Sequence, residues 1–138
     1  MHNLSYDMHK EVLFGPAAVT TATSAYKSLQ DCRRALVYAA MGATDNTFDL
    51  KVVQATDSSG TGSKDLTGAV ITQLSGTDDN KQVQIEIDPD ALDDGFTHIA
   101  VTLTIAGTTT AFVTLFKELN QKPVTQPAAL TQTILVTG

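Results

Sequence analysis

A glycine-rich loop with one lysine is the part of the sequence most similar to a ligand-binding motif. Gly60, Gly62, Ser63 and Lys64 lie between two apolar runs, as the residues of a phosphate-binding loop would. Such a loop requires a glycine directly before the lysine, a serine or threonine after it, and a following helix whose free N–H groups face the anion. Here Ser63 precedes Lys64, a β-branched segment follows, and Asp65 stands where a dinucleotide-binding motif needs its last glycine. The pattern therefore predicts a solvent-exposed turn.

Three acidic clusters raise the question of a calcium site, because hard cations gather carboxylates. An EF-hand loop that began at Asp88 would place Leu92 at a ligand position and Asp93 where the sharp turn needs a glycine, so that motif is excluded. A looser site that unites several loops stays open as an alternative to acidic turns that only keep the surface soluble. We expect no bound metal. The clusters are Asp78 with Asp79, Asp88 with Asp90, and Asp93 with Asp94.

Three histidines and one cysteine are the candidates for acid–base or nucleophilic chemistry. His2 and His9 lie near the amino terminus, His98 begins a β-branched run, and Cys32 stands alone. A single cysteine excludes an intrachain disulfide and a cysteine-based zinc site, and no nucleophile-elbow or HExxH motif occurs. Cys32 and His98 could form a dyad only if the fold brought them together. We therefore expect no enzyme, no catalytic residue and no cofactor.

The composition argues against nucleic acid and membranes as partners. The 138 residues carry a formal net charge of −6 and have a pI of about 4.7, whereas phosphate binding needs clustered lysines and arginines. Arg33 and Arg34 are the one adjacent basic pair. The amino-terminal segment lacks the basic start and sustained apolar core of a signal peptide, and no run has the length of a membrane span. Export would follow another route, such as release inside a particle by lysis.

Alternation of apolar and polar residues predicts a series of short β-strands. In the run 47–55, Phe48, Leu50 and Val52 alternate with Asp49 and Lys51, the period of two expected when one face meets a core and the other meets water. Similar runs follow turns rich in Gly, Asp and Ser, and one helical turn is expected at 90–94, before Gly95. The other strands are expected at 34–41, 68–74, 82–88, 97–105 and 111–119.

These strands predict an all-β fold, either an antiparallel β-sandwich or a small β-barrel. Residues 1–33 are expected to form an extended amino-terminal arm of small and β-branched residues, with a disordered tail as the alternative. Residues 34–118 form the β-domain in this interpretation. Residues 119–138 form an extended tail that ends in an apolar strand, and such a strand must pair with its own sheet edge or with another subunit.

The segment 48–105 is similar to a group of small structural proteins of tailed bacteriophages. The shared motifs are a strand ending in Leu-Lys-Val-x-Gln, a D-[LI]-x-G-A element, a D-D-N-K turn, and G-F-T-H before a β-branched strand. They occupy 50–54, 65–69, 78–81 and 95–98, within a resemblance that covers about residues 35–118. Some members of the group resemble capsid decoration (cement) proteins, which implies a β-barrel or β-tulip fold, trimers, and attachment to the outside of HK97-fold heads. The resemblance implies no active-site residues.

The first hypothesis is therefore a homotrimeric decoration protein on the capsid surface of a virion, made in the cytoplasm of the bacterial host. Its partners would be other copies of itself and the major capsid protein, with no nucleic acid and no membrane. Main-chain pairing by the two ends would provide attachment without a deep pocket. The candidate interface residues are Leu13, Phe14 and Val19 in the arm, and Ile134, Leu135 and Val136 in the tail.

Three other hypotheses remain open. A neck, tail or fibre component would use the same kind of pairing elsewhere on the particle. A receptor-binding or glycan-binding module is the second, although the absence of tryptophan and the few aromatic residues weaken it. The third is an enzyme, which would need the acidic loops and His98 to converge.

Overall fold

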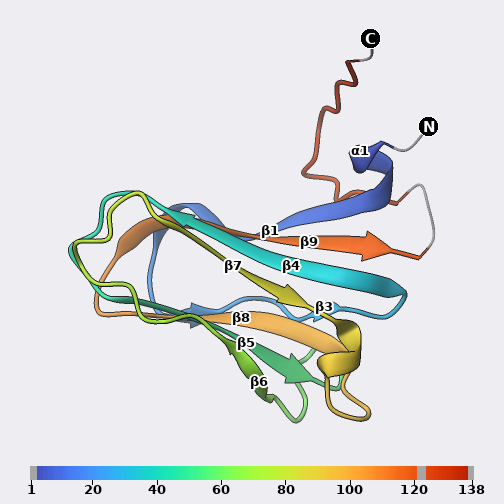
Figure 1. The fold of residues 1–138 in the computed structure, drawn as a ribbon, viewed down its shortest axis with the longest axis horizontal. Helices are drawn as coiled ribbons and strands as arrows, with labels where there is room; N and C mark the ends of the chain where they lie inside the picture. The colour runs from blue at the N-terminus through green and yellow to red at the C-terminus, as the bar shows by residue number, and fades with distance from the viewer. Residues whose placement is uncertain (1–2, 121–123, 137–138) are drawn as a thin grey trace.

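The computed structural model describes residues 3–120 and 124–136, and two antiparallel β-sheets make up its body (Figure 1). Sheet A has the strand order β1-β9-β4-β7, with β1 at Met8–Val19, β9 at Thr109–Leu119, β4 at Cys32–Met41 and β7 at Gln82–Ile87. Sheet B has the order β2-β8-β5-β6, and β3 also pairs with β8. Its strands are β2 at Ala22–Thr23, β8 at His98–Ile105, β5 at Phe48–Ala55, β6 at Lys64–Val70 and β3 at Lys27–Ser28.

The two sheets are separate ladders that face one another, so the fold is an open sandwich and not a closed barrel. This confirms the all-β prediction and decides between its two alternatives. Two short helical segments complete the described elements: α1 at Leu4–Asp7, and a 3₁₀ turn, η1, at Pro89–Ala91. The helical turn expected at 90–94 is therefore shorter and begins one residue earlier, because Asp88 accepts the hydrogen bond of Asp90 N at its start.

The core lies between the sheets and follows the expected alternation. In β4, Ala35, Val37 and Ala39 point inward and are 1–2 % exposed, while the residues between them face outward. In β5, Phe48, Leu50 and Val52 are at most 1 % exposed. Inward side chains of β8 and β9 complete the same cluster, chiefly Val101, Leu103, Val113 and Leu115.

The amino-terminal segment differs most from its prediction. Residues 8–19 are not a free arm: they form β1, which pairs with β9 from Met8↔Glu118 to Val19↔Thr109. The chain then crosses to sheet B, where β2 and β3 pair with β8. The small and β-branched side chains that suggested an arm are compatible with an edge strand, because edge pairing needs backbone groups more than side-chain bulk. Residues 1–33 thus contribute strands to both sheets.

Strand β1 bends where the sequence has Gly15 and Pro16. Gly15 has φ +67°, and a Cβ atom at this position would collide with the carbonyl oxygen of Ala111 in β9. The register between the two strands shifts on both sides of Phe14. Glycine is therefore required here both for its backbone conformation and for the close approach of β9.

Two further boundaries depart from the sequence prediction. Strand β6 covers Lys64–Val70, so it begins at the last residue of the glycine-rich loop, four residues before the predicted start, and residues 71–74 contribute one isolated bridge, Leu74 to Phe48. The apolar run Ile134–Val136 forms no strand in the described tail. None of the helices in the described residues is long and apolar enough to cross a membrane.

Candidate interaction surface

The glycine-rich loop binds its own carboxylate and is not shaped to cradle an anion. Asp57 Oδ1 accepts hydrogen bonds from Ser59 N at 2.9 Å and Thr61 N at 3.1 Å. Hydrogen bonds from Thr61 and Ser59 lower the pKa of Asp57, so its negative charge is held where a phosphate would have to bind. The turn predicted for this loop is confirmed, and its lysine serves elsewhere: Lys64 pairs with Asp93, and its ammonium lies 4.6 Å from the centre of the Phe96 ring.

The acidic clusters are used to hold local turns. Asp78 accepts hydrogen bonds from the backbone and hydroxyl of Ser75 at 2.7 and 3.1 Å, which lower the pKa of Asp78. Asp79 accepts one from Thr44 N at 2.8 Å. Asp88 starts the η1 turn, and one of its oxygens lies 3.7 Å from Arg34 Nη1. In the part of the chain that the structure describes, no three side chains of metal-binding type gather at one point.

Cys32 and His98 lie on different sheets and have different partners. Cys32 is buried at one end of β4, where its thiol donates to the carbonyl oxygen of Arg34 at 3.0 Å, and burial raises the pKa of this thiol. The Nδ1 atom of His98 lies 2.8 Å from the hydroxyl of Thr97. His98 pairs with Ala55 across the ladder of sheet B. The structure therefore does not bring the two side chains together as a dyad.

The six predicted interface residues divide into two groups. Val19 is 8 % exposed and belongs to the core, and Leu13 and Phe14 pack against that core. These three residues were expected to reach a neighbour, but β1 uses them inside its own domain. By contrast, the tail residues Ile134, Leu135 and Val136 are 81 %, 55 % and 88 % exposed. Of the six residues, only the three in the tail are exposed.

The tail is held at its root by backbone-directed hydrogen bonds to the amino-terminal end of sheet A. Val124 N donates to Tyr6 O at 2.8 Å, just before β1 begins. The Gln126 amide accepts from Lys10 N at 3.0 Å and donates to Met8 O at 2.6 Å, so it engages the outer edge of β1. Residues 124–126 therefore occupy part of this edge and fix the point from which the tail departs.

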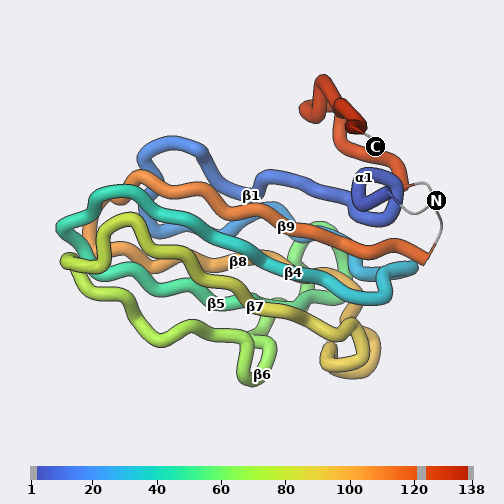
Figure 2. The backbone as a smooth tube through the Cα atoms, turned by 45° about the horizontal axis from the view of Figure 1, so that its top comes forward, coloured from blue at the N-terminus to red at the C-terminus, as the bar shows by residue number. Residues whose placement is uncertain are grey.

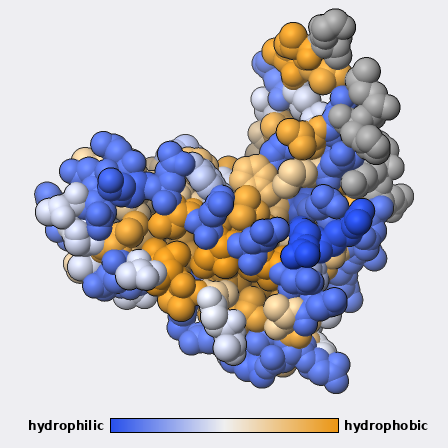
Figure 3. All heavy atoms as spheres, in the orientation of Figure 1, coloured by the Kyte–Doolittle hydropathy of each residue, from blue (hydrophilic) through white to orange (hydrophobic). Residues whose placement is uncertain are grey.

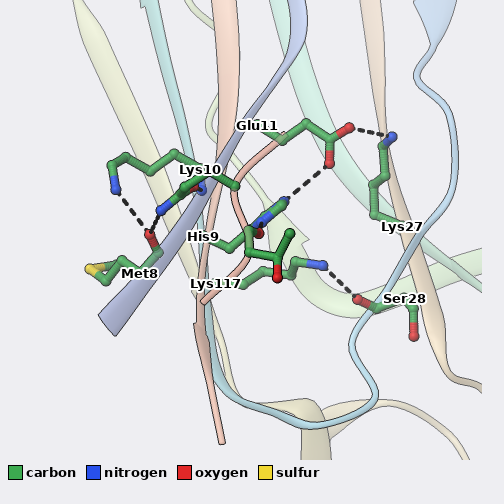
Figure 4. A network of polar contacts seen from close by, with 9 residues as sticks. Met8, His9, Lys10, Glu11, Lys27, Ser28 and Lys117 are labelled. Atoms are coloured by element: carbon green, nitrogen blue, oxygen red, sulfur yellow. Dashed lines mark hydrogen bonds and ion pairs between the residues drawn. The ribbon is translucent and has the colours of Figure 1, made fainter. Parts of the chain in front are cut away.

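A polar cluster beside the tail root connects the two sheets (Figure 4). We call it the polar clasp; its members are His9 and Glu11 of β1, Lys117 of β9, and Lys27 and Ser28 of β3. Glu11 Oε1 lies 2.6 Å from Lys27 Nζ, and Lys117 Nζ donates to Ser28 O at 3.1 Å. Both contacts run from sheet A to sheet B, because β3 pairs with β8.

His9 links the polar clasp to the tail. Its Nδ1 atom lies 2.7 Å from Thr125 O, and its Nε2 atom lies 3.5 Å from Glu11 Oε2. Since a carbonyl oxygen only accepts, Nδ1 must be the donor. Burial alone would raise the pKa of Glu11, but the hydrogen bonds and charges of Lys27 and His9 outweigh it and lower that pKa. Burial also lowers the pKa of Lys117.

Pro127, Ala129 and Leu130 still line a hollow of about 280 Å³ together with Val12 of β1 and Thr114 of β9, and the tail after them stands away from the body of the protein, as Figures 1 and 2 show. Leu130 N donates to Pro127 O at 2.9 Å, and within the described residues it is the last backbone group of the tail with such a bond. No charged residue occurs between 124 and 136. Aliphatic side chains that stand away from their own domain lack the burial that would stabilise them.

Strand β7 is a free edge on the opposite side of sheet A. It pairs with β4 over six consecutive residues without a register shift, and its other side has no partner strand in the described chain. Its inward side chains Val83 and Ile85 stay half-buried, whereas Val37 of β4 and Val113 of β9 are 1 % and 0 % exposed. The sandwich is thus incompletely covered at this side, and Figure 3 shows a band of apolar side chains there.

A shallow groove of about 180 Å³ follows this open side between β7 and β6. Ile85 and Ile87 line it from sheet A, and Leu66 and Ala69 line it from sheet B. Sequence reasoning predicted strand β7 and its alternation, but not that it would be an edge. The edge position of β7 depends on which strands pair at long range, and the local sequence pattern does not indicate it.

The comparisons with known proteins show the fold. No family model matches the chain, and no curated protein matches it. Among solved structures, the chain is similar to the SPBc2 prophage-derived protein YomS, with a TM-score of 0.53 and 11 % sequence identity over 81 % of this chain and 93 % of that one. At this identity the similarity establishes a shared β-sandwich architecture across most of both chains.

Proposed function

We propose that this protein is a structural component of a tailed-phage particle, and specifically a capsid decoration protein on the outer surface of the head. The observation that carries the proposal is the apolar tail, which is anchored at residues 124–126 and presents Ile134, Leu135 and Val136 to solvent. A folded domain with an exposed apolar segment suits attachment by strand pairing, in which backbone hydrogen bonds provide affinity and side chains provide specificity.

Two further arguments support the phage assignment. The motifs within 48–105 resemble those of small virion proteins, and the fold is shared with a protein described as prophage-derived. In addition, the side chains that could have done chemistry serve structural roles. Asp57 closes a loop, Asp93 pairs with Lys64, and Asp78 caps a turn. These arguments favour a structural protein that binds its partners through its surface and its sheet edges.

In this proposal the protein forms homotrimers that contact the major capsid protein, and neither nucleic acid nor membrane is a partner. Three copies per trimer would convert weak single contacts with the shell into durable attachment through avidity. The negative net charge of the chain is consistent with a position outside the shell, away from the packaged genome.

Quantitative mass spectrometry of purified particles tests the proposal. A decoration protein should be nearly as abundant as the major capsid protein, and immunogold label should lie on the head. A handful of copies per particle would instead indicate a neck, tail or fibre position. Absence from the particle would overturn the proposal as a whole.

Substitution of the tail tests the mechanism of attachment. The double variant Ile134→Asp with Val136→Asp should fold normally and lose its place on the head, because it introduces charge where apolar contact is needed. Val70→Asp is the matched control, since Val70 is 61 % exposed on β6, a strand of the other sheet. Equal incorporation of both variants would show that the tail does not attach the protein.

A further inference from the structure

We propose that the tail of one copy pairs with the free edge of β7 in a second copy and closes the open side of its sandwich. This inference deepens the proposed function, on which its biological role rests, but it concerns the isolated protein and can be tested there. The tail of a second copy would thus cover the β7 edge, which the described chain leaves without a partner strand.

Strand β7 is the edge best suited to accept another strand. Part of the β1 edge is occupied by residues 124–126 and the rest is bent at Gly15. Strands β2 and β3 have two residues each, and β6 has a register shift between Lys51 and Val53 of its partner. Strand β7 has six regularly paired residues and no proline. Natural edges are commonly protected by shortness, bulges, proline or charge, and β7 has little such protection.

The tail has the properties that this edge requires. The six described residues after Leu130 are Thr131–Gln132–Thr133–Ile134–Leu135–Val136, which match the length of β7 and carry no charge. In an extended strand, Ile134 and Val136 would share one face and Leu135 the other. That first face would lie beside Val83 and Ile85 and cover the inward side chains of β7, which are now half-buried.

A second copy is the occupant that the geometry favours. The tail root lies at β1, and two strands, β9 and β4, separate β1 from β7 in sheet A. After Leu130 the tail stands away from the body and does not run toward β7 (Figure 2). An edge strand also offers backbone hydrogen bonds, which the outward face of sheet A, with its half-buried Tyr38 and Phe112, does not.

Sedimentation and hydrogen exchange on the full-length protein test this pairing. The wild-type protein should associate as its concentration rises, and amide protection should increase together in residues 82–87 and 131–136. The variant Ile134→Asp with Val136→Asp should lose both effects, whereas Val70→Asp should keep them. Each aliphatic side chain removed from the contact should weaken association by about tenfold or more.

Circular dichroism and thermal unfolding of the variants show whether each one is folded. We expect the tail variant to be folded, because Ile134 and Val136 lie outside the core cluster. A second variant, Val83→Lys, tests the edge independently by placing an inward charge at β7, and it should prevent association while the tail stays intact.

Three results would overturn the inference: a monomer at every concentration, association with protection elsewhere, or protection of both segments that does not depend on concentration. The last would mean that the tail binds its own edge. Failure of this pairing with intact incorporation into particles would leave the proposed function standing. A protein that self-associates in this way but is absent from particles would support this pairing and overturn the proposed function.

Discussion

The Nδ1 atom of His9 donates a hydrogen bond to the carbonyl oxygen of Thr125 across 2.7 Å, and so joins the first strand of the domain to the root of its tail. The same imidazole faces Glu11, which in turn contacts Lys27 of the other sheet. The position of the tail is therefore coupled to the contact between the sheets.

Replacing His9 with phenylalanine should release the tail root while the domain stays folded. The variant keeps a ring of similar size but loses the donor to Thr125 O, a hydrogen bond with a net value of about 1 kcal/mol. We expect faster amide exchange and faster proteolysis at 124–126, with a small change in melting temperature. Unchanged exchange in this segment would show that Val124 and Gln126 hold the root without His9.

Glu11 should make the stability of the protein depend on pH. Its pKa is lowered in the folded state, so the stabilisation it provides is fully present above the pKa of an unfolded glutamate, about 4.3, and is lost as the pH falls through the folded pKa. Glu11→Gln should therefore be less stable than the wild type at neutral pH, and the difference should shrink in acid. Chemical unfolding at several pH values measures this difference in the free energy of unfolding.

An exposed carboxylate provides the control for this titration. Asp94 lies in the turn before β8 and is exposed. Asp94→Asn should change the free energy of unfolding little, as is usual for surface substitutions. A gap between Glu11→Gln and wild type that stayed constant from neutral to acidic pH would show that the charge of Glu11 is not what stabilises the clasp.

Gly15→Ala should destabilise the domain by about 2 kcal/mol or more, because it adds a collision with the Ala111 carbonyl to the cost of a positive φ. Gly68→Ala is the matched control: Gly68 has φ +83° but open space around its Cβ position. Its cost should be limited to about 1–2 kcal/mol. Thermal or chemical unfolding measures both costs. If the two variants lost the same free energy of unfolding, β1 and β9 would have to move apart to accept the methyl group.

Deletions at the two ends should have opposite effects. Removal of residues 1–20 takes away β1 and with it Val19, Leu13 and Phe14, so the protein should lose cooperative unfolding. Removal of residues 131–138 should leave the melting temperature unchanged at low protein concentration, where the wild type is monomeric. Calorimetry distinguishes the two. A stable domain after the amino-terminal deletion would restore the idea of a detachable arm.

Local alternation was sufficient to predict most of the sandwich. Phe48, Leu50 and Val52 identified β5 as a strand with one buried face, and the same pattern located β7 and β8. The amino-terminal segment could not be placed in this way. The side chains of β1 are mostly small or half-exposed, so the strand is defined by its partner β9, almost the whole chain away.

The candidate surface was predictable only in part. The apolar run at the end of the tail could be identified from the sequence, but the strand expected there does not form, and Ile134, Leu135 and Val136 are exposed. The polar clasp gave no signal, since His9, Glu11, Lys27 and Lys117 are scattered along the sequence and meet only through the pairing of β1 with β9 and of β3 with β8.

The pairing of β1 with β9 also has a consequence for synthesis. Strand β1 meets its partner only after Thr109–Leu119 has been translated, so sheet A is completed late, whereas the strands of sheet B end at Ile105. Domains dominated by such distant contacts fold slowly. Newly made chains would thus hold β1 without its partner until late in synthesis.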